Sequence, residues 1–240
     1  MGATIAVTFG FAAGLLAMRW TAAEALQPTA GPSGPSPQAV QAAAEPVTIP
    51  VSEPVEPTPQ PAREPTPLLR RTCGAEGARV IRWRAAVGPG LDTTPRAFAR
   101  GVAEVLCNPK GWIAGERVAF RYDPRGPVLI RLASAAETER RCLQLTGLSV
   151  RLMWSCASGS RGEVVLNANR WFEGSPSWPG GPVRYRRMLV NHEVGHILGH
   201  GHRACGAPGS AAPVMMQQSK GLGGCRPNPW PTRAELAGTH

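Results

Sequence analysis

The sequence predicts an α+β domain over residues 69–240, and three observations support this prediction. Short runs of β-branched and aromatic residues recur through the region, which is typical of strands. Stretches with helical spacing of apolar residues lie between and after these runs. Beyond residue 199 the chain is rich in glycine and proline, so we expect an irregular C-terminal subdomain that is tied together by a disulfide.

Two segments of different composition precede this domain. Residues 3–18 are largely apolar and carry no charge, so we expect residues 1–26 to be a signal peptide or a membrane anchor. The apolar run is longer than a typical signal-peptide core and shorter than a typical membrane-spanning helix, so both interpretations stay open. Residues 27–68 consist mainly of proline, alanine, glutamate, glutamine and serine. We expect them to form a disordered linker, because they have too little apolar surface to bury.

Five strands are predicted, and we expect them to form one sheet. Each is a short run dominated by apolar, β-branched or aromatic side chains, which fit the half-buried surface of a sheet. The five runs span residues 79–87, 117–122, 128–132, 149–154 and 163–168.

Three helices are predicted from capping residues and apolar spacing. Thr94 can cap a helix whose first turn accommodates Pro95. A second, short helix is expected over residues 135–145. The third follows Pro182 and ends near Gly199, because glycine favours the left-handed conformation that terminates helices.

The six cysteines indicate disulfides in an oxidising compartment. None has the CxxC spacing of a zinc knuckle or a redox motif, and an even number of cysteines suits pairing. Free buried thiols remain the alternative. We therefore expect an extracytoplasmic protein, either secreted or held at the membrane by an uncleaved N-terminal segment. The expected pairs are Cys205 with Cys225, Cys142 with Cys156 and, by elimination, Cys73 with Cys107.

The net charge of +10 does not indicate a nucleic-acid partner. The chain has only two lysines, and its arginines are scattered rather than clustered on one stretch. No nucleic-acid-binding motif is present. We expect instead a generally basic surface that contacts anionic polymers of the cell envelope.

The segment HEVGHILGHGH contains a pattern that predicts a metal site. His192 and His196 are four residues apart, so both rings lie on one face of a helix and can bind one zinc ion. In a continued helix, His202 would lie about 9 Å beyond His196, too far to share the ion. A chain reversal at Gly199 removes this obstacle. We expect His202 to be the third ligand and His200 a neighbouring or exposed side chain, although His200 could compete for the position.

Glu193 follows the first predicted ligand and is the candidate general base. Zinc lowers the pKa of its bound water to about 7, so a nearby carboxylate can accept a proton from that water. The same carboxylate can then pass the proton to a leaving amine. This arrangement predicts hydrolysis of peptide bonds.

The runs LVNHEVGHILGHGHRAC and APVMMQQSKGLGGCRPNPW carry a resemblance to a known family. The first contains HExxHxxGxxH, the metzincin signature. Together the runs closely resemble an actinobacterial extracytoplasmic family of unknown function that is grouped with metzincin-like zinc peptidases. The resemblance implies a metzincin-like (zincin) fold, in which a mixed β-sheet lies over the active-site helix and an edge strand aligns peptide substrate. We expect that edge strand at residues 163–168.

The resemblance also implies a methionine turn beneath the metal, with Met215 as first choice and Met216 as the alternative. Many relatives place a tyrosine after this turn to stabilise the oxyanion, but Gln217 and Gln218 stand here. Gln217 or Arg203 could donate instead.

Together, these patterns predict a zinc-dependent endopeptidase that acts on proteins or cell-envelope peptides, including the cross-links of the cell wall. The alternative is a catalytically silent, zinc-stabilised module that binds envelope peptides. Glu193 favours the enzyme, because a purely structural zinc site needs no carboxylate beside an open position.

Overall fold

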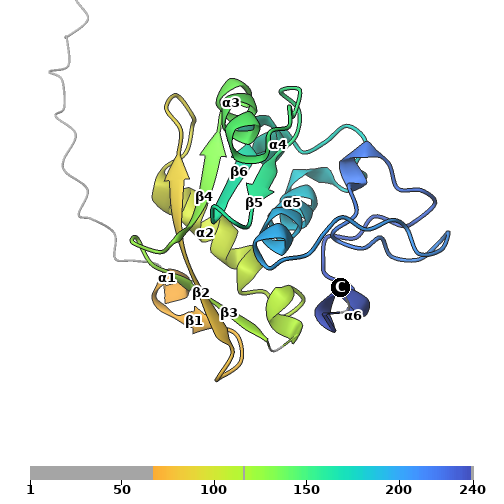
Figure 1. Cartoon of the computed structure of the whole chain (residues 1–240), viewed down its shortest axis with the longest axis horizontal. Coiled ribbons are helices and arrows are strands. Elements are labelled where there is room, and N and C mark those ends of the chain that lie inside the picture. The colour runs from red at the N-terminus through yellow and green to blue at the C-terminus, as the bar shows by residue number, and fades with distance from the viewer. Residues whose placement is uncertain (1–66, 116, 239–240) are drawn as a thin grey trace, which may run out of the picture. The chain divides into compact units, whose positions relative to one another are not determined.

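The computed structural model describes residues 67–115 and 117–238. Figure 1 shows a β-sheet, the helices that pack on it and a C-terminal segment with little regular structure. The expected signal peptide or anchor, and residues 27–66 of the expected linker, lie outside the described residues. Within the described ranges, no helix combines the length and the apolar character needed to cross a membrane.

Six strands form one mixed sheet in the order β1-β3-β2-β4-β6-β5. The four inner strands run parallel to one another, and the two edge strands, β1 and β5, are antiparallel to their neighbours. A mixed sheet was expected from the sequence, and it is confirmed. The strands are β1 (Thr72–Cys73), β2 (Arg79–Val87), β3 (Val118–Tyr122), β4 (Val128–Ala133), β5 (Cys156–Ser158) and β6 (Glu163–Asn167).

The prediction of a strand at residues 149–154 is wrong. This stretch belongs to a loop, residues 147–155, which we call the wall loop. Arg151 and Leu152 have φ angles of 52° and 58°, so the chain turns instead of extending. Side chains bind the Leu152 backbone groups that a neighbouring strand would otherwise bind: its N–H donates to the Glu139 carboxylate and its carbonyl accepts from the Asn167 amide, both at 3.0 Å.

The prediction that residues 163–168 form the edge strand is also wrong. β6 lies inside the sheet between β4 and β5, and the edge strand on this side is β5. Four of the five β6 residues are buried. A strand that is covered on both faces shows a continuous apolar run rather than alternation, and Val164, Val165 and Leu166 form such a run.

The three predicted helices are present close to their expected limits. α2 (Pro95–Leu106) is capped by Thr94, whose hydroxyl accepts from the Ala97 N–H. α3 (Ala135–Thr146) ends at Gly147, and α5 (Gly181–Ile197) precedes Gly199. Short elements were not predicted: they are the edge strands β1 and β5, the helices α1 (Pro67–Arg70), α4 (Ala168–Glu173) and α6 (Arg233–Leu236), and the 3-10 turns η1 (Trp112–Gly115) and η2 (Gln218–Lys220).

Helices cover both faces of the sheet. In β6, Val164 and Leu166 belong to the main apolar core, which they share with α2 and α5. Val165, between them, belongs to a smaller core with Cys142 of α3. Because successive strand side chains point to opposite faces, α3 covers the face opposite α2 and α5. α5 packs against β5 and β6, which brings it next to an edge of the sheet.

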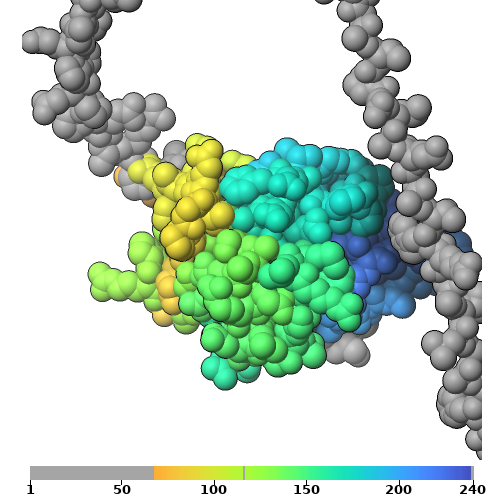
Figure 2. Space-filling model, turned by 90° about the horizontal axis from the view of Figure 1, so that it is seen from above, coloured from red at the N-terminus to blue at the C-terminus, as the bar shows by residue number. Residues whose placement is uncertain are grey.

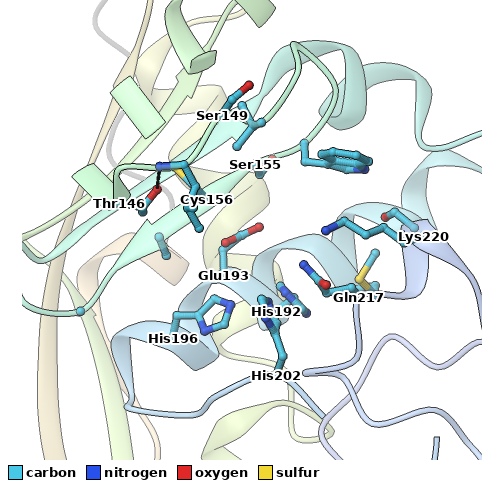
Figure 3. Close-up of a pocket in the computed structure, with 17 residues that line it drawn as sticks. Thr146, Ser149, Ser155, Cys156, His192, Glu193, His196, His202, Gln217 and Lys220 are labelled. Carbon is cyan, nitrogen blue, oxygen red and sulfur yellow. Dashed lines mark hydrogen bonds between the residues drawn. The ribbon is translucent and has the colours of Figure 1, made fainter. Parts of the chain in front are cut away.

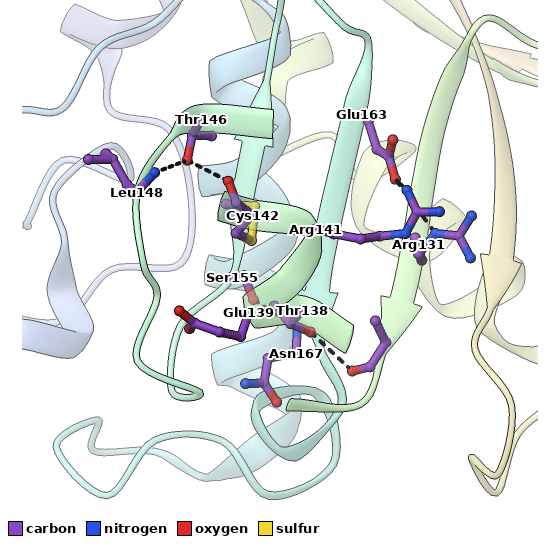
Figure 4. Close-up of a disulfide and its surroundings, with 12 residues drawn as sticks. Arg131, Thr138, Glu139, Arg141, Cys142, Thr146, Leu148, Ser155, Glu163 and Asn167 are labelled. Atoms are coloured by element: carbon purple, nitrogen blue, oxygen red, sulfur yellow. Dashed lines mark hydrogen bonds and ion pairs between the residues drawn. A yellow bond between two sulfur atoms is a disulfide. The ribbon is translucent and has the colours of Figure 1, made fainter. Parts of the chain in front are cut away.

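All three expected disulfides are confirmed, and no cysteine is free. Cys73–Cys107 joins β1 to the end of α2, and Cys142–Cys156 joins α3 to β5 at the base of the wall loop (Figure 4). Cys205–Cys225 closes the C-terminal segment on itself. This segment packs against the preceding parts of the domain (blue in Figure 2). Three disulfides are typical of an oxidising, extracytoplasmic environment.

Candidate metal centre

Three histidines converge on one point beside α5. His192 and His196 lie one turn apart on this helix, and His202 follows the chain reversal after it. One ligand atom from each ring lies within 4.8 Å of those from the other two, so a single ion could contact all three. The centroid distances between pairs of rings are 5.1, 5.3 and 4.8 Å. Figure 3 shows these rings facing a cavity that also receives Glu193.

The reversal that delivers His202 occurs at Gly199, as the sequence predicts. α5 ends at Ile197, and Gly199 has a φ angle of 98°, which disfavours residues with a side chain. The His200 N–H then donates to the Gly195 carbonyl at 2.9 Å, which closes the helix end. This local geometry places His202 beside the other two rings.

Backbone carbonyls orient two of the rings. The Nδ1 atoms of His192 and His196 each lie 2.8 Å from a carbonyl oxygen, of Val214 and His200 respectively. When Nδ1 carries the proton and donates to the carbonyl, Nε2 keeps a free lone pair that faces the shared point. The arrangement therefore fixes the tautomer that a metal ligand needs.

His200 takes a supporting place, in line with its lower ranking as a ligand. Its ring stacks on Trp112 with centroids 4.5 Å apart. It lines a second cavity of about 240 Å³ rather than the one in front of the triad. Its backbone carbonyl orients His196, so its contribution to the site does not depend on its own ring.

The environment of the site favours neutral side chains. Burial, followed by the charge of His196, lowers the pKa of His192 to about 3. Burial also lowers the pKa of His196 and of His202. Burial raises the pKa of Glu193 to about 8. The histidines are thus in the neutral form that binds metals, and Glu193 is a carboxyl group with an affinity for protons near neutral pH.

Met215 forms the floor of the site. Its side chain is fully buried, and it contacts α5 at Gly195, between the two histidines of the helix. A side chain at position 195 would overlap the Met215 sulfur and approach Trp112 to 2.9 Å, so this position requires glycine. Met216 is half-buried and lies near Gly223 instead. Met215, and not Met216, thus packs against the helix that carries two of the histidines, and the assignment of a turn methionine stays a prediction.

Glu235 supports this floor, and the sequence did not reveal it. Its buried carboxylate accepts hydrogen bonds from the backbone N–H groups of Val214 and Met215, at 3.1 and 2.9 Å. It also accepts from the Thr232 N–H and hydroxyl, both at 2.7 Å. The T-x-x-E capping box of α6 was visible in the sequence. The contact between Glu235 and the methionine turn could not be seen in the sequence, because the two segments meet only in the folded chain.

A cavity of about 430 Å³ opens in front of the triad (Figure 3). The wall loop and β5 form one side, and residues 217–220 form the other. Two cavity residues escaped the sequence reasoning: Lys220 and Trp154, whose amino group and ring centroid lie 4.7 Å apart. Trp154 belongs to the wall loop and Lys220 ends the three-residue turn η2, and neither element is long enough to show a periodic signal.

Of the expected oxyanion donors, only Gln217 lines this cavity. Gln218 is buried, and its side-chain amide binds Pro213 and Asn228. Arg203 is not among the residues that line the cavity. Lys220 is a second possible donor that the sequence did not suggest. The assignments of metal ligand, general base and donor stay predictions.

The fold and site define a mixed α/β domain, stabilised by three disulfides, with three histidines that could hold a metal ion. The chain belongs to the family described as "Protein of unknown function (DUF3152)", which matches residues 67–225. The matched range contains the histidine triad, Glu193 and Lys220, and it ends before Glu235. No curated protein matches the chain.

Proposed function

We propose that this protein is a metzincin-like, zinc-dependent endopeptidase, with His192, His196 and His202 as ligands. The observation that carries the proposal is a three-histidine site at the floor of an open cavity, with a buried carboxylate beside it. Structural zinc sites in proteins are closed by four protein ligands, whereas catalytic sites keep three and leave one position open. The described residues supply three.

The donor set fits zinc. Three neutral imidazoles suit zinc, and also copper, iron and nickel, whereas magnesium and calcium require oxygen ligands. The carbonyls of Val214 and His200 hold two of the rings by their second nitrogen, which is the usual support for a metal-binding histidine. Zinc binds in a tetrahedral geometry, and three histidines and one water complete it.

Glu193 would act as the general base. When bound, zinc makes its water acidic and polarises the substrate carbonyl. The positive charge of the ion opposes the effect of burial, so Glu193 would be ionised in the loaded protein and would accept the proton of the water. Glu193 would then deliver this proton to the departing amine. Gln217, which lines the cavity, would donate to the carbonyl oxygen as its negative charge develops.

The edge strand supports a peptide as substrate. β5 is an antiparallel edge strand, and its Cys156 and Ala157 line the cavity. An extended peptide can add to such an edge through backbone hydrogen bonds, which would place its carbonyl groups before the triad. Proteins or cell-envelope peptides are the substrates that an extracytoplasmic enzyme of this kind would meet.

A second candidate is a binding module that holds peptides without cleaving them. The chain has two tyrosines, and neither Tyr122 nor Tyr185 lines the cavity. The Tyr185 hydroxyl is hydrogen-bonded to Ser219 at 2.9 Å. The tyrosine donor of many metzincins therefore has no counterpart among the described cavity residues. This absence favours the silent binding module.

The two candidates separate in one experiment with the full-length protein. Bound zinc and hydrolysis of a broad peptide library would be measured for the parent and for Glu193→Ala. The peptidase predicts one zinc per chain in both proteins and cleavage by the parent alone. Equal zinc in both proteins with no cleavage by either would favour the binding module. Cleavage that persists in the variant would remove Glu193 from the role of base.

A further inference from the structure

Lys220 is distinct among the residues that line the cavity. Apart from the three histidines and the buried Glu193, it is the one lining side chain in the described residues that carries a formal charge. The other wall residues are apolar or carry neutral hydroxyl and amide groups. The wall of the cavity away from the triad is therefore cationic, and its charge comes from one atom.

The position of Lys220 is fixed by its neighbours. It ends η2, whose Gln218 is buried and makes three hydrogen bonds to Pro213 and Asn228. Ser219, next to Lys220, is held by the Tyr185 hydroxyl through its side chain and by Ser177 through its carbonyl. The two residues that precede Lys220 are thus anchored to other parts of the domain.

Lys220 is exposed to solvent, and its amino group contacts the opposite wall of the cavity. Its Nζ lies over the Trp154 ring of the wall loop, 4.7 Å from the centroid, in a cation–π contact. Lys220 lines the same cavity as His192 and His202. Among the described residues, no carboxylate lies within ion-pair distance of this amino group. Within the described part of the chain, this cation therefore faces the same cavity as the triad without an anionic partner.

We propose that Lys220 selects peptide substrates that carry a carboxylate within two residues of the scissile bond. This inference rests on the proposed peptidase function and names the substrate class of the same site. A carboxylate would supply the missing counter-charge, and it would do so against an aromatic ring that excludes water from one side. Acidic side chains and a free peptide C-terminus both provide this chemistry. Neutral and basic peptides leave Lys220 without a partner.

The test uses binding as a readout that does not depend on turnover. Full-length, zinc-loaded Glu193→Gln protein would be titrated calorimetrically with blocked hexaalanine peptides that carry one glutamate, moved through the six positions. The same peptides with glutamine are the neutral controls. Lys220→Met and Lys220→Glu would be introduced into this background. Lys110→Met is the matched control, because Lys110 is the other lysine of the chain and does not line the cavity.

We expect the glutamate peptide to bind about fivefold more tightly than its glutamine partner at one or two positions, as for a partly exposed ion pair. The preference should vanish in Lys220→Met, reverse in Lys220→Glu and persist in Lys110→Met. Screening by salt should reduce it. Equal binding of the two peptides, a preference that survives Lys220→Met, or no binding of any glutamate peptide would overturn the inference.

Hydrolysis by the parent protein separates this inference from the proposed function. If glutamate and glutamine peptides are cleaved with equal kcat/KM, the peptidase stands and the carboxylate preference fails. If glutamate peptides bind preferentially but none is cleaved, the preference stands and the peptidase fails. A loss of kcat on both peptides in Lys220→Met would assign Lys220 to the oxyanion and overturn its role in selection. A free-acid peptide and its C-terminal amide would distinguish a terminal carboxylate from a side chain.

Discussion

Two parts of the domain are stabilised by different means. From β2 to α3, regular strands and helices bury a continuous apolar core, with Phe98 and Leu132 almost inaccessible to solvent. From Gly199 to Thr232, the chain has one short turn, η2, and one isolated bridge between Ala211 and Arg226. Buried polar side chains, a disulfide and the proposed metal take the place of secondary structure there. The first part supplies the scaffold, and the second supplies His202, the methionine turn and Lys220.

The largest effect on stability is expected from the apolar core. Phe98 is buried on α2 and packs edge-to-face on Trp171 with centroids 4.9 Å apart. Phe98→Ala should lower the free energy of unfolding by about 4 kcal/mol. Chemical denaturation with and without a zinc chelator would test this. We expect Phe98→Ala to lose the same free energy of unfolding with and without the chelator. A loss that depends on the chelator would contradict the separation of the apolar core from the metal site.

Removal of the C-terminal disulfide should have a slightly smaller effect. Cys205 and Cys225 are 20 residues apart. Replacing both with alanine should cost about 3 kcal/mol through the added freedom of the unfolded chain. Zinc content should also fall, because this disulfide belongs to the same segment as His202 and Met215. As a control, the double replacement of Cys142 and Cys156, 14 residues apart, should cost a similar free energy without loss of zinc.

Glu235→Ala should affect the metal site more than the scaffold. It leaves the buried N–H groups of Val214 and Met215 without their acceptor, which we expect to cost about 2 to 3 kcal/mol. Because the Val214 carbonyl orients His192, zinc affinity should fall by a factor of about 10 to 100. Zinc titration would measure this, with the exposed Glu104→Ala on α2 as control. Unchanged zinc affinity in Glu235→Ala would show that the methionine turn does not support zinc binding.

The smallest effect is a change in proton release on zinc binding. Burial raises the pKa of Glu193 from 4.5 to about 8, so at pH 7 the metal-free folded protein holds this proton. A dication favours the carboxylate, so zinc binding should release this proton, and zinc affinity should rise as the pH increases toward 8. Glu193→Gln should release about one proton fewer at pH 7. Calorimetry in buffers of different ionisation enthalpy would detect this, and equal release would argue against the raised pKa.

In the metal-free protein, the raised pKa of Glu193 predicts the direction in which the free energy of unfolding changes with pH. Because the folded state holds the Glu193 proton more strongly than the unfolded state, this group's contribution to stability is present below pH 4.5 and is lost as the pH rises toward 8. His192, with its pKa lowered from 6.5 to about 3, acts in the opposite direction. Its contribution is present above pH 6.5 and is lost as the pH falls toward 3.

The scaffold could be predicted where local chemistry determines it. Thr94 and Pro95 marked the start of α2, and apolar spacing marked α3 and α5. The histidine spacing and Gly199 were sufficient to bring the triad together. In these cases the residues that determine the structure are close in sequence, so their spacing is enough to predict it.

The rest depended on contacts between distant segments. The order of strands placed β6 inside the sheet and β5 at its edge, and no local pattern specifies that order. The wall loop has the apolar residues of a strand, but Glu139 and Asn167 bind its backbone and turn it. Glu235 binds Met215, 20 residues before it, and Lys220 contacts Trp154 of the wall loop, which is far from it in the sequence. Their roles could be seen only once the C-terminal segment was placed on α5.

The central claim is that the reversal at Gly199 makes His202, and not His200, the third ligand of a zinc site whose other two ligands lie on α5. Bound zinc per chain, measured by mass spectrometry for the parent, His202→Ala and His200→Ala, tests it most directly. We predict one zinc in the parent and in His200→Ala, whose backbone carbonyl still orients His196, and none in His202→Ala. Zinc retained in His202→Ala and lost in His200→Ala would contradict it.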